Sequence, residues 1–454
     1  MNLIRLSILK LADSEINFNT DGIHDIMSII KKYLYLELDN KNIKKAVSMW
    51  CTNKNEALKI YGHISSWDTR QVTSMRGLFS EFSMFNDDIS KWNVANVKDM
   101  SLMFYYASSF NQFINEWDVT NVKDMSYMFC NAFSFNQPIN NWNVSQVKNM
   151  EQMFSDAYSF NQSINIWNVS NVENMRGMFW GASSFNQPIN DWDVAQVVNM
   201  ENMFWNAESF NQYINDWNII NVKNTESMFM NAISFNQPIN NWKVDSVENM
   251  ANMFQNAKSF NQALNNWIVT NVKKMKQMFC EASSFNQDIS NWDVSNVKNM
   301  EGMFWGAISF NHPLDNWHVN QVKTMKYMFA NATSFNQQIN NWQVNEVLDM
   351  QYMFANANSF NQPLDMWNVD QVIDMNSMFY DTVSFNQSIE CWNVDNVRDM
   401  RNMFQNAISF NQPINNWNIN KRAYIQSMFK GASSFKQSID KWKINEIQKT
   451  SLWI

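Results

Sequence analysis

Residues that build metal sites, disulfides and phosphate-binding loops are scarce in this 454-residue chain. It contains four cysteines, four histidines, six prolines and eight glycines. The cysteines are scattered without a Cys-x-x-Cys pair, and no spacing of histidine, cysteine and carboxylates matches a zinc site. The few glycines form no phosphate-cradling loop. We therefore expect no metal, no cofactor and no enzymatic activity.

Long apolar runs and an excess of basic charge are also absent. The formal net charge is −8, which predicts no general affinity for nucleic acid. No apolar run approaches the roughly 18 residues of a membrane span, so we expect none. The first residues are apolar, but Arg5 and Lys10 interrupt them, Asp13 follows, and no small-residue cleavage site is present. This pattern predicts mature protein rather than a signal peptide.

Tryptophan, by contrast, is frequent and regularly spaced. Most of the 21 tryptophans recur at a fixed step of 25 residues, without insertion or deletion. A fixed period of about 20–50 residues is typical of solenoids, in which each repeat packs on its neighbours. The periodic residues are Trp67, Trp92, Trp117, Trp142, Trp167, Trp192, Trp217, Trp242, Trp267, Trp292, Trp317, Trp342, Trp367, Trp392, Trp417 and Trp442.

One unit, beginning at Trp117, reads as a strand followed by a helix. Trp117 and Val119 alternate with Asp118, which predicts a short strand with both apolar side chains inward. The next apolar residues follow helical spacing and predict a helix of about two turns. They are Val122, Met125, Met128, Phe129 and Ala132. Asp124 stands where an N-cap would, and Asn131 stands where a left-handed residue would end the helix.

A third side of each unit carries the sequence Ser-Phe-Asn-Gln-x-Ile. We expect Phe135 and Ile139 to face the core. The repeated asparagine, Asn136 in this unit, should bond neighbouring backbone groups as a ladder, because leaving such groups unpaired costs about 1–3 kcal/mol each. All six prolines share one position of the unit, Pro138 here. That position should therefore donate no backbone hydrogen bond.

The predicted fold is an α/β repeat solenoid with one short parallel strand and one short helix per 25-residue coil. Strands stack about 4.8 Å apart and helices about 8–10 Å apart, so we expect gentle curvature with the strands on the concave side. Residues 62–454 should form about 15–16 coils. Residues 1–61 lack the repeat and should form a helical N-terminal cap. The expected helices are Asp25–Leu38, Ile43–Trp50 and Asn53–Tyr61, with Gly62 ending the last.

The recurring string Met-Phe-x-x-Ala-x-Ser-Phe-Asn-Gln-x-Ile-x-x-Trp-x-Val-x-x-Val-x-x-Met resembles a known repeat. It is similar to the BspA-like repeat of surface proteins, which is leucine-rich-repeat-like and was first catalogued as a mycoplasma domain of unknown function. The match covers about residues 62–454, and the segment from Ala46 to Trp67 resembles the usual lead-in. The resemblance implies a parallel leucine-rich-repeat-like solenoid with an adhesion or interaction role and no catalytic residues.

The resemblance also bears on location. Similar arrays occur in bacteria, protists, algae and giant DNA viruses, and bacterial members usually carry an export signal. We expect none here, and the four single cysteines fit reduced thiols. Together with the Asn-, Ile- and Lys-rich composition, this favours an intracellular or virion-associated protein, such as a giant-virus member.

Two non-enzymatic functions fit these observations. The first is a structural or protein–protein interaction element, such as a component of a viral particle or another large assembly, and the uniform period favours it. The alternative is a soluble adaptor or adhesin-like recognition protein, whose N-terminal helical module recruits cellular machinery. In either case the expected partner is another protein or a second copy of the chain.

Candidate partner-binding residues stand at two irregular positions of the unit. Most coils carry a small or polar residue directly after Met-Phe, but several carry Tyr105, Trp180, Trp205, Met230, Trp305 or Tyr380. Three positions further along the unit, Phe133, Tyr158 and Ile233 are apolar. Clustered aromatic residues outside the core stripe are enriched in interfaces. The alternative is that these side chains only cover the flank of the helix.

The C-terminal coil is a further candidate. Trp453 and Ile454 align with the Met-Phe pair of other coils, so we expect the chain to reach its last residue within a helix, without a polar cap. Residues 421–454, which include Trp442, carry a local excess of lysine and arginine. Exposed apolar ends invite association. We therefore predict that this coil is buried against another copy or a partner.

Two polar surfaces complete the set. Lysine recurs at the position of Lys123 and predicts a solvated face. Outward strand positions such as Asp118 and Asn143 form a flat Asn/Asp array. That array offers oxygen ligands to a glycan or to calcium, but we expect solvation to explain it.

Overall fold

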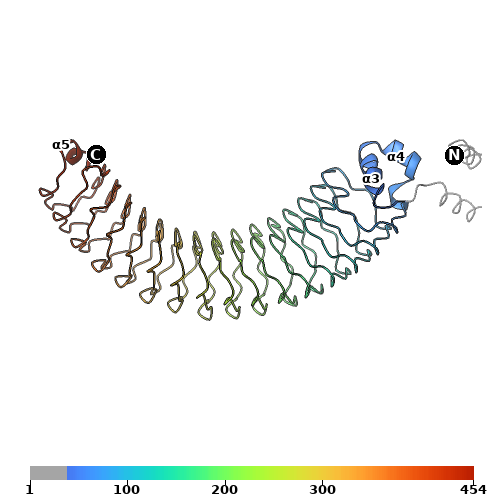
Figure 1. Cartoon of the computed structure of the whole chain (residues 1–454), viewed down its shortest axis with the longest axis horizontal. Helices are drawn as coiled ribbons and strands as arrows, with labels where there is room; N and C mark the ends of the chain where they lie inside the picture. Colours follow the sequence, from blue (N-terminus) through green and yellow to red (C-terminus); the bar gives the residue numbers. More distant parts are fainter. Residues whose placement is uncertain (1–37) are drawn as a thin grey trace, which may run out of the picture.

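The structure, a computed structural model, describes residues 38–454. The helix predicted at 25–38 lies outside the described residues except for its last position. Figure 1 shows the described chain as an open arc of stacked coils, with helices at both ends. The predicted leucine-rich-repeat-like solenoid is confirmed, and the curvature leaves the arc far from a closed ring.

Short helices cover the N-terminal end of the arc. Helices α3 (Ile43–Thr52) and α4 (Lys54–Tyr61) confirm the two helices predicted there, and a 3-10 turn, η1 (Ile64–Ser66), leads into the array. The side chain of Asn53 caps α4, and Gly62 ends it with a φ of 74°. A left-handed φ of this kind is accessible to glycine without steric cost.

The N-terminal helices dock onto the first coils through a small polar and aromatic cluster. The ring centroids of Trp50 and Trp67 lie 5.9 Å apart in an edge-to-face contact. Trp50 Nε1 donates a hydrogen bond to Asp87 at 2.8 Å, and Lys54 Nζ contacts the other carboxylate oxygen of Asp87 at 2.7 Å. The apolar core of these helices is therefore continuous with the core of the array.

The inward positions predicted from the sequence are confirmed. In the unit that begins at Trp117, the tryptophan is 3% exposed and Val119 is 1% exposed, whereas Asp118 between them is exposed. The apolar stripe that follows is fully buried, as are Phe135 and Ile139. Each coil thus contributes the same side chains to one continuous core, which removes apolar surface from water coil by coil.

The helix predicted within each coil is wrong. Inside the array, from residue 67 to 445, no coil contains a helix. Consecutive tight turns take its place: the N–H of Met128 bonds the carbonyl of Met125 at 3.2 Å, and the N–H of Ala132 bonds that of Phe129 at 3.0 Å. These turns direct the same side chains inward as a helix would, which explains why the spacing suggested one.

Two left-handed residues per coil make the tandem turns possible. Tyr127 has a φ of 58° and Asn131 a φ of 59°, and the same two positions are left-handed in every coil from Gly77 to Gly431. Asn131 is therefore left-handed, as predicted, but it belongs to a turn and ends no helix. Tyrosine rarely adopts this conformation, so the first of the two positions gives no signal in the sequence.

The predicted strand is reduced to one parallel bridge per coil. The bridges lie at the position of Asp124, which pairs with Asp99 on one side and Asn149 on the other, and not at Trp117. The Oδ1 of Asp124 accepts the N–H of Ser126 at 2.8 Å. This side chain, predicted as a helix cap, forms an Asx turn instead.

A ladder of backbone hydrogen bonds joins the coils along the turn segment. N–H groups at alternate positions each donate to a carbonyl of the next coil, at 2.6–3.2 Å. In one coil the donors are Met125, Tyr127, Phe129 and Asn131. Direct backbone bonding holds neighbouring chain segments about 4.8 Å apart.

Side chains supply most of the bonds on the other sides of the coil. Trp142 Nε1 donates to the carbonyl of Ile114 at 3.0 Å. Asn111 Oδ1 accepts the backbone N–H of Asn136 at 2.9 Å and the side-chain amide of Gln137 at 3.2 Å. The predicted asparagine ladder is thus confirmed. On this side an asparagine side chain lies between neighbouring coils, whereas along the turn segment backbone groups bond directly to each other.

The arc bends because these two kinds of contact hold neighbouring coils at different spacings. Successive coils are related by the same rotation and translation. The distance between equivalent rings of neighbouring coils therefore measures the spacing of the coils at that side of the arc. The centroids of Trp117 and Trp142 lie 6.5 Å apart, whereas those of Trp180 and Trp205, beside the backbone ladder, lie 4.6 Å apart. The more closely spaced turn side is therefore the concave side of the arc in Figure 1, and the wider spacing of the periodic tryptophans places them toward the convex side. The bridges lie on the concave side, whereas the residues predicted as the strand, Trp117 to Val119, lie toward the convex side. The predicted position of the strand is therefore wrong.

The C-terminal end also differs from the prediction. Helix α5 (Glu446–Ser451), which begins with a capping box, follows the last coil. Leu452 is fully buried, and its carbonyl accepts the N–H of Phe429 at 2.9 Å. Leu452 therefore takes the place that the 25-residue register assigned to Trp453. A polar helix with no buried residue covers this end, where no polar cap was expected.

Candidate protein-interaction surface

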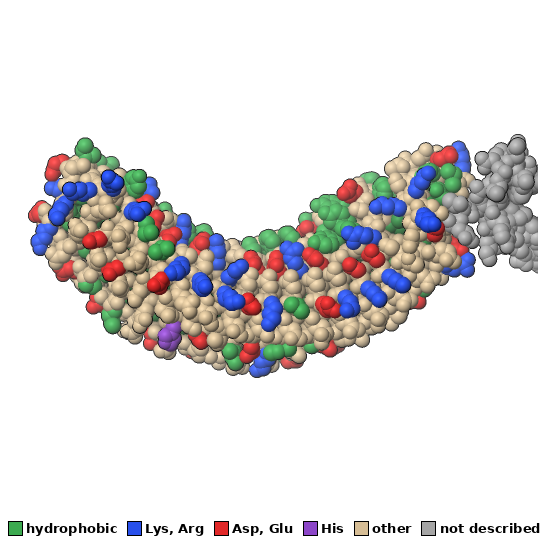
Figure 2. Space-filling view, viewed as in Figure 1, with side chains coloured by type: hydrophobic (Ala, Val, Ile, Leu, Met, Phe, Trp, Pro, Cys, Tyr) green, Lys and Arg blue, Asp and Glu red, His purple; other side chains and the backbone are tan. Residues whose placement is uncertain are grey.

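Half-exposed aromatic side chains form a strip on the concave side of the arc. Figure 2 shows hydrophobic side chains gathered along the concave edge over the N-terminal half. Phe133 and Tyr158 are 36% and 46% exposed, and their rings stack 5.0 Å apart. Trp180 and Trp205 stack 4.6 Å apart with planes 5° from parallel. Four predicted candidates thus form two stacked pairs in four successive coils.

Tyrosines extend this strip toward the N-terminal helices. The ring of Tyr105, a predicted candidate, lies 4.6 Å from that of Tyr106 and 6.5 Å from that of Tyr127. Sequence analysis missed Tyr106 and Tyr127 because both stand at left-handed positions of the tandem turns. A helical reading gave no reason to group them with Tyr105. The concave strip, as used below, comprises Tyr105, Tyr106, Tyr127, Phe133, Tyr158, Trp180 and Trp205.

The remaining aromatic and apolar candidates lie further along the array. Met230 is half-buried and Ile233 is 37% exposed, and both belong to the coil after Trp205. Trp305 stands apart from the concave strip and stacks on Tyr327 at 5.3 Å. The structure therefore separates Trp305 from the candidates with which the sequence grouped it.

The indole ring of Trp205 makes no hydrogen bond to the array among the described residues. Every periodic tryptophan from Trp67 to Trp442 donates its indole N–H to a backbone carbonyl. The N–H of Trp205 is buried without a partner among the described residues. A buried donor without a partner costs about 1–3 kcal/mol. The side chain at this position is thus not explained by the stability of the fold.

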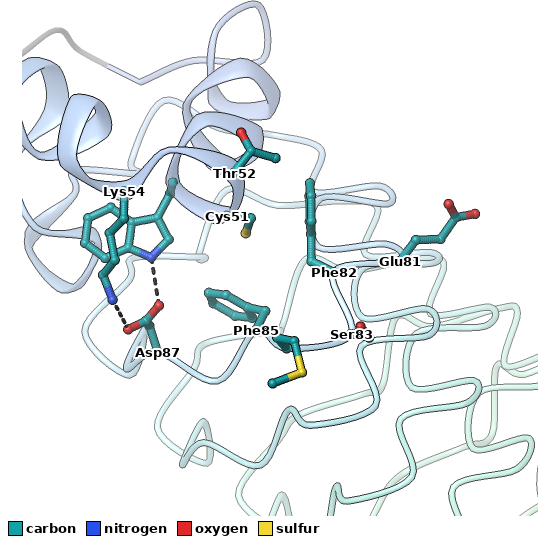
Figure 3. Close-up of a pocket in the computed structure, with 10 residues that line it drawn as sticks. Cys51, Thr52, Lys54, Glu81, Phe82, Ser83, Phe85 and Asp87 are labelled. Atoms are coloured by element: carbon teal, nitrogen blue, oxygen red, sulfur yellow. Dashed lines mark hydrogen bonds and ion pairs between the residues drawn. The ribbon is translucent and has the colours of Figure 1, made fainter.

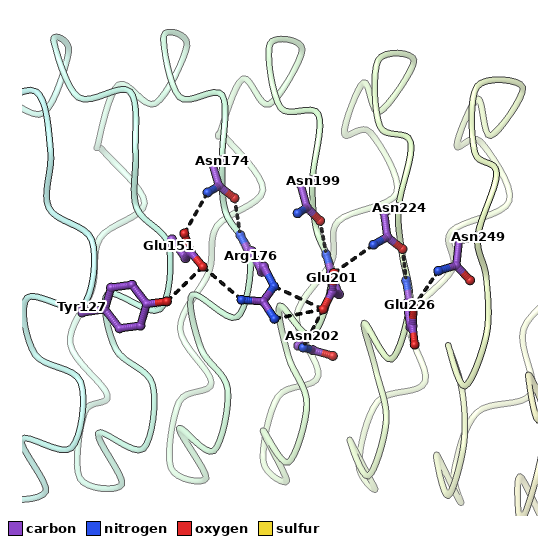
Figure 4. A network of polar contacts seen from close by, with 10 residues as sticks. All are labelled: Tyr127, Glu151, Asn174, Arg176, Asn199, Glu201, Asn202, Asn224, Glu226 and Asn249. Carbon is purple, nitrogen blue, oxygen red and sulfur yellow. Dashed lines mark hydrogen bonds and ion pairs between the residues drawn. The ribbon is translucent and has the colours of Figure 1, made fainter.

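A ladder of charged side chains runs beside the concave strip (Figure 4). Arg176 lies between two glutamates of the neighbouring coils, with its guanidinium nitrogens 3.0 Å from Glu151 and 3.1 Å from Glu201. Burial alone would lower the pKa of Arg176, but the hydrogen bonds to Glu201 and Glu151 raise it above its usual value. The guanidinium is therefore permanently charged and fully engaged.

The charged ladder contacts the aromatic strip directly. Tyr127 donates its hydroxyl hydrogen to Glu151 at 3.0 Å. Burial and the Glu151 carboxylate raise the pKa of Tyr127 to about 12. Further along, Glu226 has no basic partner among the described residues and accepts only the side-chain amide of Asn249, at 2.6 Å. The flank of the strip therefore carries more carboxylates than basic groups.

An open hollow lies where the N-terminal helices meet the first coils (Figure 3). It has a volume of about 440 Å³, and its lining includes Trp50, Cys51, Phe82 and Phe85. Burial raises the pKa of the Cys51 thiol to about 12, so the thiol is neutral and unreactive. A second hollow shares Glu81 with the first and is lined by tyrosines of the concave strip. The two hollows are thus neighbours, and the second reaches Tyr105 and Tyr106 of the concave strip.

Comparison with known families identifies the repeat. The family model described as "Mycoplasma protein of unknown function, DUF285" matches the chain in overlapping segments without a gap from residue 43 onward. The matched segments are 43–167, 112–213, 156–267, 260–367 and 359–454. The chain belongs to the DUF285 family. The resemblance drawn from the sequence is therefore confirmed, and no curated protein matches the chain significantly.

Solved structures similar to this DUF285 chain include two leucine-rich-repeat proteins. A leucine-rich cell surface protein from Faecalibacterium prausnitzii shares 11% identity with a TM-score of 0.36, over 73% of this chain and 86% of its own. A leucine-rich repeat protein from Bacteroides ovatus shares 12% identity with a TM-score of 0.33, over 74% and 82% of the two chains.

At the C-terminal end of the DUF285 array, the predicted candidates have different environments. Trp442 is only 3% exposed and belongs to the core. Trp453 is 47% exposed, its ring 5.4 Å from that of Phe429, and Ile454 is 69% exposed. Only Trp453 and Ile454 are therefore accessible to a partner, and Trp442 acts through the packing of the last coil.

The polar surfaces of the DUF285 array are occupied by local contacts. Asp118 Oδ1 accepts the N–H of Thr120 at 3.1 Å, so its carboxylate supports a turn. Among residues 38–454, no three His, Cys, Asp or Glu side chains are placed to hold a metal ion. Lys148 pairs with Glu173 of the next coil at 2.9 Å. Both side chains are more than half exposed, and such pairs contribute at most about 1 kcal/mol.

The cysteines of the DUF285 chain are all free thiols. Burial raises the pKa of Cys130 to about 11 and that of Cys280 to about 12, so these thiols are neutral. In the part of the chain that the structure describes, none of the helices is both long and apolar enough to cross a bilayer.

Proposed function

We propose that this DUF285 chain is a non-enzymatic protein-recognition element that binds its partner on the concave strip. The supporting observation is the concentration of half-exposed, mutually stacked aromatic rings in successive coils. The core is the same in every coil, so folding alone gives no reason for aromatic residues at these surface positions. Tyrosine and tryptophan are enriched among residues that dominate binding energy.

The geometry of the stacked rings favours a protein over a glycan. A sugar ring packs on an exposed aromatic face, but here each ring in a stacked pair covers the face of the other. One face of each of these rings is therefore taken up by its neighbour. Such rings suit apolar side chains and backbone carbonyls of a protein.

A second candidate function is a structural element of a large assembly, such as a virion. The uniform core supports it, because nearly identical coils stack into one regular arc. Under this proposal the accessible residues Trp453 and Ile454 pack against another copy or a neighbouring protein, with Trp442 ordering the coil beneath them. The free thiols fit the proposed intracellular or virion-associated setting.

Helices α3 and α4 support a more specific form of the recognition function, in which the chain is an adaptor. They are fixed to the array through Trp50 and Asp87, so a partner held on the concave strip would sit in a defined position relative to them. An adaptor of this kind would bring that partner to cellular machinery bound at the N-terminal helices.

Site-specific photo-crosslinking in native cells tests the recognition proposal. We expect p-benzoylphenylalanine in place of Tyr158 to crosslink one defined protein. The same probe in place of Asn168, an exposed convex residue, should give no such product. The double variant Trp180→Ala/Trp205→Ala should reduce the Tyr158 crosslink several-fold. Equal crosslinking at both positions, or none at Tyr158, would contradict the proposal, and products only from a probe at Ile454 would favour the assembly role.

A further inference from the structure

We infer that the segment bound on the concave strip is basic and amphipathic. The inference rests on the proposed recognition function and adds the chemistry of the partner. Two features carry it: the excess of carboxylates beside the strip, and the length over which aromatic side chains are exposed. Each is specific to the N-terminal half of the concave side.

The charge beside the strip is acidic and only partly neutralised. Between residues 151 and 230 the concave positions carry four glutamates, Asp156 and one basic residue, Arg176, which gives a local formal net charge of −4. The glutamates are Glu151, Glu201, Glu208 and Glu226. Arg176 is shared by Glu151 and Glu201, and no ion pair is formed by Glu208 or Glu226 among the described residues. A partner that brings lysine or arginine would complete this ladder.

The apolar part of the partner is required by the stacked rings. Phe133 and Tyr158 remain 36% and 46% exposed in the unbound chain. Covering these side chains removes apolar surface from water, which favours binding of an apolar face. Because the strip and the glutamates lie side by side, joined by the bond from Tyr127 to Glu151, one segment with an apolar and a basic face contacts both.

The extent of the strip sets the length of the segment. From Tyr105 to Trp205 it crosses five coils, or four steps of about 4.8 Å, which is about 19 Å. An α-helix of about 13 residues has this length. An intact domain would have to enter the concave side of the arc, whereas a single helix laid along it meets every ring.

The C-terminal half of the concave side provides an internal control. Trp305 and Tyr327 also stack there, but Lys326 Nζ lies 5.2 Å over the ring of Tyr327 and Lys276 pairs with Glu301 at 3.2 Å. Aromatic side chains are thus present without the excess of carboxylates. A basic segment should therefore prefer the N-terminal half.

Titration of the full chain with defined peptides tests the inference. The probe is a fluorescein-labelled helical peptide of about 18 residues with one leucine face and one lysine face. Control peptides replace lysine by glutamate or leucine by serine. We expect only the lysine–leucine peptide to bind, with affinity that falls several-fold as salt rises from about 50 to about 300 mM.

Matched variants locate the site. Trp180→Ala/Trp205→Ala and Glu201→Gln/Glu226→Gln should each weaken binding by about tenfold or more, whereas Trp305→Ala should leave it unchanged. Circular dichroism and thermal melting confirm that each variant is folded.

Three outcomes would overturn the inference: equal binding of the glutamate–leucine peptide, equal loss in Trp305→Ala, or no binding of any peptide at about 100 μM. Sedimentation that shows a dimer lost in the Glu201/Glu226 variant would identify a second copy as the occupant and also overturn it. If no peptide binds but the Tyr158 crosslink still forms, the inference fails while the recognition function stands.

Discussion

At the scale of single residues, tryptophan has two separate roles in this chain. The periodic tryptophans fill the core and bond the carbonyl of the preceding coil, as Trp242 does with Ile214 at 2.8 Å. Trp180 and Trp205 do neither, since they are half-buried and stack on each other on the concave surface. Tryptophan therefore stabilises the fold at the periodic core position, and we propose that it binds a partner at the position of Trp180 and Trp205.

Replacing a core tryptophan should be costly in the middle of the array. We expect Trp242→Ala to lower the free energy of unfolding by about 3–5 kcal/mol, because a large side chain is lost from a site that cannot collapse. Asp293→Ala, on the exposed convex side, should change it by no more than about 0.5 kcal/mol. Urea unfolding compares the two, and similar losses in both variants would show that the inside and outside positions are misassigned.

Two aspartates at the bridge position should respond to pH with opposite signs. Burial raises the pKa of Asp349, and the neighbouring Asp374 carboxylate adds to the rise. Burial alone would also raise the pKa of Asp399, but hydrogen bonds from Arg401 and Asn376 lower it below its usual value. The folded state therefore disfavours the charged form of Asp349 and favours that of Asp399.

The sign of each effect follows from linkage. Asp349, with a raised pKa, favours folding at acidic pH and loses this contribution as pH rises. Asp399, with a lowered pKa, favours folding at neutral pH and loses this contribution as pH falls. At pH about 7 we expect Asp349→Asn to raise the urea midpoint and Asp399→Asn to lower it, with both differences shrinking near pH 3. The same sign for both variants would contradict this account.

At the scale of the coil, the sequence predicted which residues face inward but not the backbone that places them there. Val122, Met125 and Ala132 are buried as expected, because periodicity reports the side on which a residue lies. Periodicity does not distinguish a helix from tandem turns that repeat every four residues. The deciding residues are the left-handed pair, and Tyr127 is not a residue type that signals this conformation.

The sequence likewise predicted several residues of the candidate site but not their arrangement. Phe133, Tyr158, Trp180 and Trp205 were found because they depart from a nearly uniform repeat. Their stacking in pairs depends on the close spacing of coils at the concave side, which arises from the backbone ladder and not from residue type. The charged ladder beside them was missed because Glu151 and Arg176 lie 25 residues apart and meet only after the coils stack.

Proline substitutions test the tandem turns directly. Ser388 stands at the position that holds proline in six other coils, and its N–H makes no hydrogen bond among the described residues. Ser377 has a φ of 54° and donates to the carbonyl of Arg401 at 2.9 Å. We expect Ser388→Pro to be neutral within about 1 kcal/mol and Ser377→Pro to cost about 3 kcal/mol or more.

Thermal melting of the two proline variants tests whether the N–H of Ser377 and its left-handed conformation belong to the backbone ladder, with Ser388 as the control. A small effect at Ser377 would show that the left-handed turn is not formed there, and the proposed backbone ladder would be wrong at that coil.

At the scale of the whole molecule, curvature and recognition have the same origin. Direct backbone bonds on one side and side-chain bonds on the other give unequal spacing, so the array bends toward the turn side (Figure 1). The bend brings aromatic rings of successive coils into contact at 4.6–5.0 Å. The concave strip is thus a product of the solenoid as a whole, and no single repeat contains it.

Hydroxyl-radical footprinting of the chain, alone and bound to its crosslinked partner, tests the central claim most directly. Mass spectrometry reads the oxidation of Tyr158 and Trp180 on the concave strip, with Met366, a 68% exposed residue on the convex side, as the control. We predict that oxidation of Tyr158 and Trp180 falls several-fold in the complex while that of Met366 is unchanged. Protection of Met366 with no change at Tyr158 and Trp180 would show that the partner binds elsewhere and would contradict the account.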